Sequence, residues 1–195
     1  MSTPPKVLPI KEEDDDKPKV HHPFLPEVGV GQKGKGSCLL LLSPRQTGKS
    51  TVISNMLLND KFYGPAFFDE VYRPEIAIVL DDCVGIMDKE IANLATRSRH
   101  YNIKLLAVSS QKFRGALDPV LRANVTDIIV GSPFPNMRDL TAVAEEYGDQ
   151  YGGAENWMKL YKEATPEKYN FAYMKLSNPP RMFHNFEKEL VVKKE

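Results

Sequence analysis

The sequence has little of what marks secreted and membrane proteins. It contains two cysteines in 195 residues, and no apolar run approaches the roughly 18 residues of a membrane-spanning helix. The first residues are prolines and acids, not the apolar stretch of a secretory signal. We therefore expect a soluble protein of a reducing compartment with no membrane span. Cys38 and Cys83, each beside an apolar run, are then expected to be small buried thiols.

Net charge is missing too, because 26 Lys and Arg residues balance 26 Asp and Glu residues. A protein that coats nucleic acid as a monomer is usually basic. Contact with DNA or RNA would therefore need a local basic patch, or several subunits that each contribute a few charges. The hydrophobic content of 42% and charged content of 27% are ordinary for a globular protein, and the length allows a sizeable core.

The composition divides the chain into three parts. Residues 1–35 are rich in proline and carry an acidic block at 12–16, so they bury too little apolar area to fold alone and predict a disordered or loosely docked arm. Residues 36–178 alternate apolar runs with amphipathic stretches and predict one folded domain. Pro179-Pro180 predicts the end of regular structure, which leaves a polar tail over 179–195.

The pattern within 36–178 predicts strands alternating with helices. Buried strands are expected at 37–43, 75–82, 103–111 and 126–132, helices at 48–59, 88–97, 117–124, 136–147 and 154–164, an edge strand at 169–177, and a further strand at 67–72. This order predicts an α/β three-layer sandwich with a mainly parallel central sheet. A parallel crossover needs a dozen or more residues. Either 67–72 is therefore not a parallel neighbour of 75–82, or one crossover unit is missing.

The stretch SPRQTGKS has the form of a phosphate-binding loop between a buried strand and a helix. Backbone N–H groups of such a turn can hold phosphates, and the helix N-terminus adds favourable partial charge. Lys49 would reach the β- and γ-phosphates, and the Ser50 hydroxyl would bind Mg²⁺. Ser43 and Gln46 stand where this pattern often has glycine. The expected ATP-binding residues are Ser43, Pro44, Arg45, Gln46, Thr47, Gly48, Lys49, Ser50 and Thr51.

Polar residues also follow the next two buried strands. Asp81 is expected to bind Mg²⁺, directly or through water, and Asp82 to act as the general base that polarises the attacking water. Gln111 can hydrogen-bond the γ-phosphate or orient that water. The plainer interpretation for Asp82 and Gln111 is helix or turn capping. Lys49, Asp82 and Gln111 are the predicted catalytic residues, and the candidates for an arginine acting on a neighbouring subunit's nucleotide are Arg97, Arg99 and Arg122.

With these motifs in place, the run over 97–132 resembles the genome-packaging ATPases of eukaryotic DNA viruses, in the poxvirus-type branch of the FtsK–HerA superfamily of P-loop NTPases. The resemblance covers roughly residues 37–186. Its motifs, in order, are Lys49-Ser50, Asp81-Asp82, Arg99-His100, Ser110-Gln111 and Arg122-Ala123-Asn124. Taken singly the loop is generic, but the later motifs in this order are more specific.

The resemblance implies ATP hydrolysis, with Mg²⁺, coupled to moving double-stranded DNA into a preformed capsid. It implies a homo-oligomeric ring that contacts DNA non-specifically in its pore, and capsid or portal-vertex proteins as partners. The expected location is the host cytoplasm or viral factory, or the virion.

Two other functions stay open from the sequence. A degenerate P-loop protein could bind nucleotide and act as an assembly factor without turnover, as a missing crossover unit would favour. A small-molecule or nucleotide kinase would use the same loop, but the Ser-Gln pair at the end of a strand argues against it.

Overall fold

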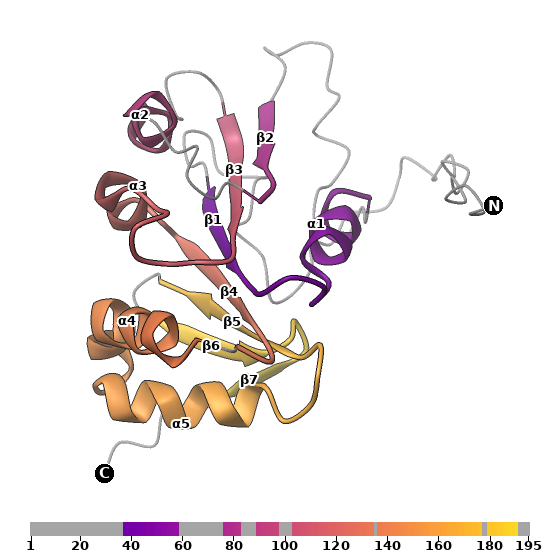
Figure 1. Cartoon of the computed structure of the whole chain (residues 1–195), viewed down its shortest axis with the longest axis vertical. Coiled ribbons are helices and arrows are strands. Elements are labelled where there is room, and N and C mark those ends of the chain that lie inside the picture. The colour runs from indigo at the N-terminus through magenta and orange to yellow at the C-terminus, as the bar shows by residue number, and fades with distance from the viewer. Residues whose placement is uncertain are drawn as a thin grey trace, which may run out of the picture.

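The computed structural model shows an α/β fold around one seven-stranded mixed sheet (Figure 1). It describes residues 37–58, 76–82, 89–97, 103–134, 136–176 and 179–190. Several predictions lie outside these ranges, namely the arm over 1–35, the strand over 67–72, Cys83 and Arg99-His100. The short connection between 67–72 and 75–82, on which the question of a missing crossover unit depends, lies outside them as well.

The strand order across the sheet is β2-β3-β1-β4-β5-β6-β7. The first four strands pair in parallel, and β4 onward pair antiparallel. The parallel strands are β1 (Ser37–Leu42), β2 (Ile76–Leu80), β3 (Ile103–Ser110) and β4 (Asp127–Gly131). Every residue of β1 and β4 is buried, as expected for strands covered on both faces. The predicted α/β fold with a mainly parallel core is confirmed at this level.

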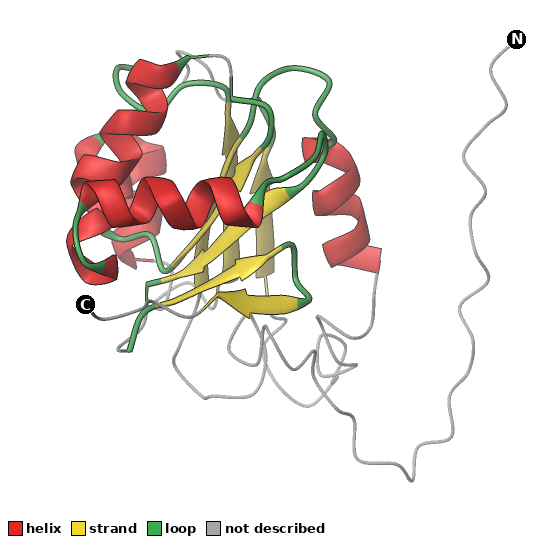
Figure 2. Ribbon diagram, turned by 90° about the horizontal axis from the view of Figure 1, so that it is seen from below, coloured by secondary structure: helices red, strands yellow, loops and turns green. Residues whose placement is uncertain are grey.

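Helices cover both faces of the sheet (Figure 2). α1 (Lys49–Leu58) lies on one face, where Ile53 and Met56 pack on Leu39 and Leu41 of β1. The other face carries α2 (Lys89–Arg97), α3 (Pro119–Ala123), α4 (Met137–Tyr147) and α5 (Ala154–Ala164). The chain moves from β1 to β2 in one direction and from β2 through β3 to β4 in the other. Right-handed crossovers therefore place α1 opposite α2 and α3.

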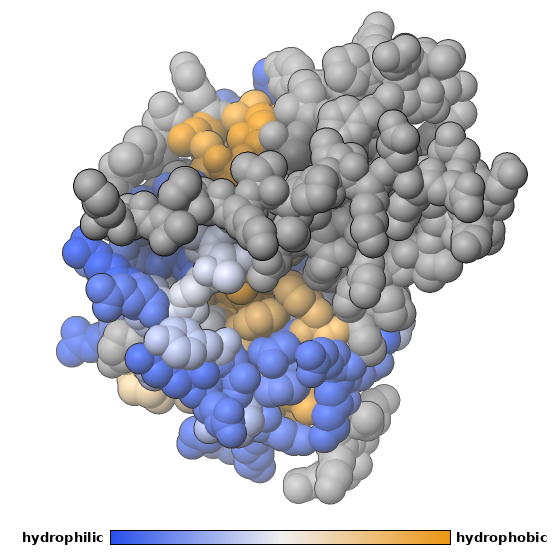
Figure 3. Space-filling model, turned by 90° about the vertical axis from the view of Figure 1, so that its right-hand side faces the viewer, coloured by the Kyte–Doolittle hydropathy of each residue, from blue (hydrophilic) through white to orange (hydrophobic). Residues whose placement is uncertain are grey.

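The larger core layer lies under α2–α5 and centres on aromatic side chains. Trp157 and Tyr151 are fully buried there, and the Trp157 and Tyr161 rings stack 5.6 Å apart. The smaller layer, beside α1, is less completely covered by the described residues. On the side of the molecule seen in Figure 3, hydrophobic surface lies between hydrophilic residues; the partly buried hydrophobic residues of this layer are Val52, Val79, Phe171 and Phe186.

Two predictions about the C-terminal part are wrong. The strand β5 (Phe171–Lys175) is not at an edge, because it pairs with β4 on one side and with β6 on the other. Regular structure also does not end at residue 178, since β6 (Arg181–His184) and β7 (Lys188–Leu190) continue the sheet. The physical reason is burial: Met182 packs into the layer under α2–α5 and Phe183 into the layer beside α1. The folded unit therefore includes residues that the sequence assigned to a polar tail.

The predicted helices at 136–147 and 154–164 are confirmed. The Asn136 side chain accepts a hydrogen bond from the backbone N–H of Arg138 and caps α4. Between them lies a short 3₁₀ helix, η3 (Gly148–Tyr151), and the left-handed Gly152 ends it. Among the helices that the structure describes, none combines the length and the apolar character needed to cross a membrane.

Candidate functional site

The 43–50 loop lies where β1 ends and α1 begins. Gln46 and Gly48 have φ angles of 58° and 86°, in the left-handed region. Glycine adopts this conformation freely, whereas a glutamine there costs on the order of 1–3 kcal/mol. The Gly48 carbonyl accepts the first helical hydrogen bond, 2.9 Å from the Val52 nitrogen. The sequence departure at Gln46 is thus accommodated as local backbone strain at the turn.

Ser43, the other departure, stabilises the loop from within. It is 2% exposed, and its hydroxyl lies in very short contact with the Thr47 hydroxyl. Thr47 in turn donates to the Pro44 carbonyl at 2.7 Å. The Lys49 Nζ donates to the Ser43 and Pro44 carbonyls at 2.8 and 2.9 Å. A Cβ on Gly131 would come within 2.2 Å of the Ser43 Oγ, so the end of β4 closes directly against the loop.

The carboxylate of Asp81 lies beside the start of α1. Its Oδ2 accepts a hydrogen bond from the Ser50 hydroxyl at 3.0 Å, and its Oδ1 accepts a very short one from the Ser109 hydroxyl. These bonds, Ser109 first and Ser50 second, lower the pKa of Asp81 against the opposing effect of burial, and nearby Lys49 lowers it further. The arrangement stabilises a negative charge next to the loop.

The second carboxylate, Asp82, has different partners. It has a left-handed φ of 54°, and its Oδ1 accepts a hydrogen bond of 2.6 Å from the Gln111 side-chain amide. Its backbone N–H donates to the Ser109 hydroxyl at 2.8 Å. The two neighbouring carboxylates therefore have different side-chain partners, although both residues lie at the surface.

The sheet register brings these residues together. Leu80 of β2 pairs with Val108 of β3, so the residues that follow, Asp81 and Ser109, lie side by side. Leu41 of β1 pairs with Ser109 from the other side of β3. The loop and the two carboxylates therefore meet across β3 at the C-terminal ends of three parallel strands, which is where ligands bind in open α/β sheets.

Electrostatics connect the loop to the two carboxylates. Partial burial lowers the pKa of Lys49, while the negative charges of Asp82 and Asp81 act against this shift and Arg45 adds to it. Arg45, Gln46, Ser50 and Thr51 are exposed, whereas Pro44, Thr47, Gly48 and Lys49 are partly covered. The predicted loop residues thus lie together with Asp81 and Asp82 in one charged region of the surface.

The side-chain oxygen atoms in this charged region suit a hard divalent cation that also binds phosphate. In the described ranges no group of three His, Cys, Asp or Glu side chains gathers that could hold a metal ion by itself. Magnesium in nucleotide sites is bound through one or two carboxylates together with phosphate oxygens and water. Asp81 and Ser50, whose oxygens lie 3.0 Å apart, fit that requirement.

Comparison with known proteins gives no relative. No family model, curated protein or solved structure matches this chain.

Arg97 and Arg122, the two candidate arginines within the described residues, lie away from the loop. Arg97 is exposed at the end of α2, and Arg122 lies in the last turn of α3, so both precede the N-terminal ends of strands. Arg122 is engaged within its own chain, because it donates to Glu146 at 2.7 Å and its guanidinium lies 5.0 Å from the centre of the Phe113 ring. Arg122 would have to break both contacts to reach a neighbouring subunit, whereas Arg97 has an exposed side chain.

Ser109 is a site residue that was not predicted from the sequence. It is fully buried and contacts both carboxylate residues. The run AVSSQ offers three polar residues at the end of one strand, and only the register with β2 selects the first serine. A weak signal existed, since the second of two serines in a buried strand faces the opposite layer from the first.

Replacing Ser109 with alanine is expected to raise the pKa of Asp81 and to lower the free energy of unfolding by about 1–3 kcal/mol at neutral pH. The Asp81 pKa is lowered in the fold, so its contribution is full above the ordinary aspartate pKa of about 3.9 and is lost as the pH falls through the lowered value. Urea unfolding at neutral and acidic pH should show the destabilisation shrink on acidification.

The matched control is Ser110→Ala. Ser110 is just as buried, but its hydroxyl bonds only the backbone of Lys112. It should lose comparable stability at both pH values. A Ser109→Ala destabilisation that does not change with pH would contradict the assigned role.

Proposed function

We propose that this protein is a magnesium-dependent ATPase that moves double-stranded DNA during viral genome packaging. The observation that carries the hydrolytic part is the arrangement at the C-terminal ends of the parallel strands, where Asp81 is hydrogen-bonded to Ser50 of the 43–50 loop and neighbouring Asp82 to Gln111. The DNA-moving part, the ring and the capsid partners rest on the resemblance of the 97–132 run to packaging ATPases.

Each side chain has a distinct part in this proposal. Lys49 donates to the β- and γ-phosphates, and the backbone of the loop and of the first turn of α1 surrounds the phosphate oxygens. Ser50 and Asp81 hold Mg²⁺, which when bound offsets negative charge on the phosphates. The low pKa of Asp81 keeps it ionised for this task.

Asp82 and Gln111 act on water in this proposal. Asp82 accepts the proton of the attacking water, and Gln111, 2.6 Å from Asp82, orients that water against the terminal phosphate. Among the contacts described, Asp82 makes no hydrogen bond to the loop. Its carboxylate can therefore accept a proton from the water, while the Asp81 carboxylate binds the metal. General base catalysis of this kind contributes about 10²- to 10⁴-fold to a rate.

The test is ATP hydrolysis by the purified protein, with and without long duplex DNA, beside the Lys49→Ala variant. Turnover that duplex DNA raises, and that Lys49→Ala removes, supports the proposal. The variant should also bind ATP at least about tenfold more weakly, since a charged hydrogen bond contributes about 1.5–3 kcal/mol.

Other outcomes would assign a different function. ATP binding without turnover would identify a nucleotide-binding assembly factor instead. Phosphate transfer to a small acceptor, with no response to DNA, would identify a kinase. A protein that stays monomeric by light scattering, with a non-hydrolysable ATP analogue and DNA present, would contradict the ring.

A further inference from the structure

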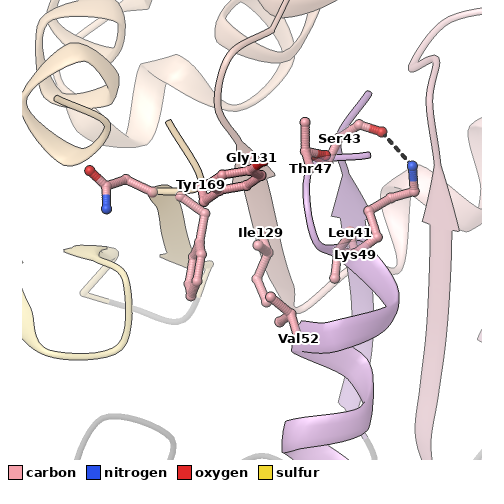
Figure 4. A pocket seen from close by; sticks show the side chains of 10 residues that line it. Leu41, Ser43, Thr47, Lys49, Val52, Ile129, Gly131 and Tyr169 are labelled. Atoms are coloured by element: carbon pink, nitrogen blue, oxygen red, sulfur yellow. Dashed lines mark hydrogen bonds between the residues drawn. The ribbon is translucent and has the colours of Figure 1, made fainter. Parts of the chain in front are cut away.

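A hollow lies beside the 43–50 loop, on the side of β4 and β5 (Figure 4). Thr47 and Lys49 line it from the loop and from the start of α1. Its other walls are largely apolar, with Val52 and Ile129 among them, and Tyr169 stands at its border. One wall therefore carries the groups proposed to bind phosphates, and the remainder offers an apolar surface.

The end of β4 makes the hollow and the loop one continuous surface. No side chain fits between them at Gly131, because an added Cβ would lie 2.2 Å from the Ser43 Oγ and 2.9 Å from its Cβ. The end of β4 thus lies directly against the loop, so a ligand whose phosphates lie on the loop can reach this hollow with the rest of its structure.

Tyr169 has an exposed aromatic ring at the border of the hollow. The residue is 57% exposed, unlike almost every other large hydrophobic residue that the structure describes. Its side chain extends toward the 43–50 loop in Figure 4, and Lys168 Nζ lies 4.8 Å from the ring centre. A large part of the ring is therefore available for contact with a ligand.

The backbone holds Tyr169 in this position at a cost. Its φ of 73° lies in the left-handed region, which is unfavourable for a bulky residue. The Tyr169 N–H donates to the Ser132 carbonyl at 3.2 Å, and the Ser132 N–H donates to the Asn170 carbonyl at 3.0 Å. These bonds fix the turn before β5 to the end of β4, so the ring is carried by a defined part of the sheet.

We propose that the nucleobase of the triphosphate stacks on the exposed Tyr169 ring, over the mouth of this small hollow. The inference rests on the proposed function, since it needs the phosphates on the 43–50 loop. A flat base with apolar faces suits apolar walls and an exposed aromatic ring, and stacking on aromatic side chains tolerates different bases. Tyr169 would therefore add affinity for the nucleotide without contacting its phosphates.

The experiment compares two ligands, ATP and inorganic tripolyphosphate, by calorimetric titration in Mg²⁺. The test variant is Tyr169→Asn, because asparagine tolerates the left-handed conformation and has no aromatic ring. Tyr169→Phe is the matched control, because it keeps the ring and removes only the hydroxyl. We expect Tyr169→Asn to bind ATP about tenfold more weakly, the order found when one stacking partner of a base is removed.

Tripolyphosphate separates the possible outcomes. Its affinity should be the same in wild type, Tyr169→Asn and Tyr169→Phe, and ATP should bind Tyr169→Phe as it binds wild type. ATP affinity unchanged in Tyr169→Asn, while Lys49→Ala weakens both ligands, would overturn the nucleobase site alone. An equal loss for both ligands in Tyr169→Asn would also overturn it, since the residue would then shape the loop. Indifference of both ligands to Lys49→Ala would overturn the proposed function and the nucleobase site with it.

Discussion

Replacing Phe183 with alanine is expected to lower the free energy of unfolding by about 3–5 kcal/mol. Phe183 is fully buried in a strand of only four residues. Its ring stacks on Tyr173 at 5.6 Å, and the Arg181 guanidinium lies 4.8 Å from its centre. A natural domain is stable by about 5–15 kcal/mol in total, so this loss is a large share. Urea unfolding measures it.

Phe186 provides the matched control for this prediction. It belongs to the same aromatic group, with its ring 4.8 Å from Phe171 and 5.4 Å from Tyr173, but it is only partly buried. Phe186→Ala should therefore lose clearly less stability than Phe183→Ala. If Phe183→Ala leaves the unfolding midpoint unchanged, residues 181–190 are a separable tail and not part of the folded unit.

Replacing Asp82 with asparagine is expected to slow ATP turnover by about 10²- to 10⁴-fold while leaving ATP affinity unchanged. Asparagine has the shape of aspartate but accepts no proton at neutral pH. Its side-chain oxygen can still accept the hydrogen bond from Gln111, so the local structure should persist. Single-turnover phosphate release, combined with calorimetric ATP binding, separates the two effects. Full turnover in Asp82→Asn would remove Asp82 as the general base.

Asp81→Asn gives the contrast. Asp81 accepts a hydrogen bond from the Ser50 hydroxyl beside the loop and is the proposed metal ligand. The Asp81→Asn variant should therefore need a higher Mg²⁺ concentration for half-maximal ATP binding. Identical phenotypes in the two variants would contradict the separate roles that their different hydrogen bonds suggest.

The sequence predicted best those elements whose own residues show a clear pattern of burial. The run SCLLLLS is apolar between its two serines, and β1 is buried at every position. The helix over 154–164 was predicted to the residue, because glycines precede it and its apolar positions recur at helical spacing. In these segments local propensity and tertiary packing agree.

Elements that depend on distant partners were not predictable in this way. β6 and β7 have four and three residues, too few to show a period. They are strands because β5 offers a hydrogen-bonding edge to β6, and β6 offers one to β7. The strand order is a further case, since β3 lies between β2 and β1 although the chain visits it third. No local pattern encodes that order, and with it the meeting of Asp81 with Ser109.

Lys49 donates hydrogen bonds to the Ser43 and Pro44 carbonyls. This lysine therefore has a second role, because it stabilises the conformation of its own loop. Replacing Lys49 with alanine removes one donor from each of these two carbonyl oxygens and loosens a turn in which Gln46 is already strained. A Lys49 variant therefore reports on loop stability as well as on phosphate affinity. Measuring the unfolding of the variant without nucleotide separates these two effects. The difference in the free energy of unfolding between the variant and wild type is then the contribution of the Lys49 hydrogen bonds to loop stability.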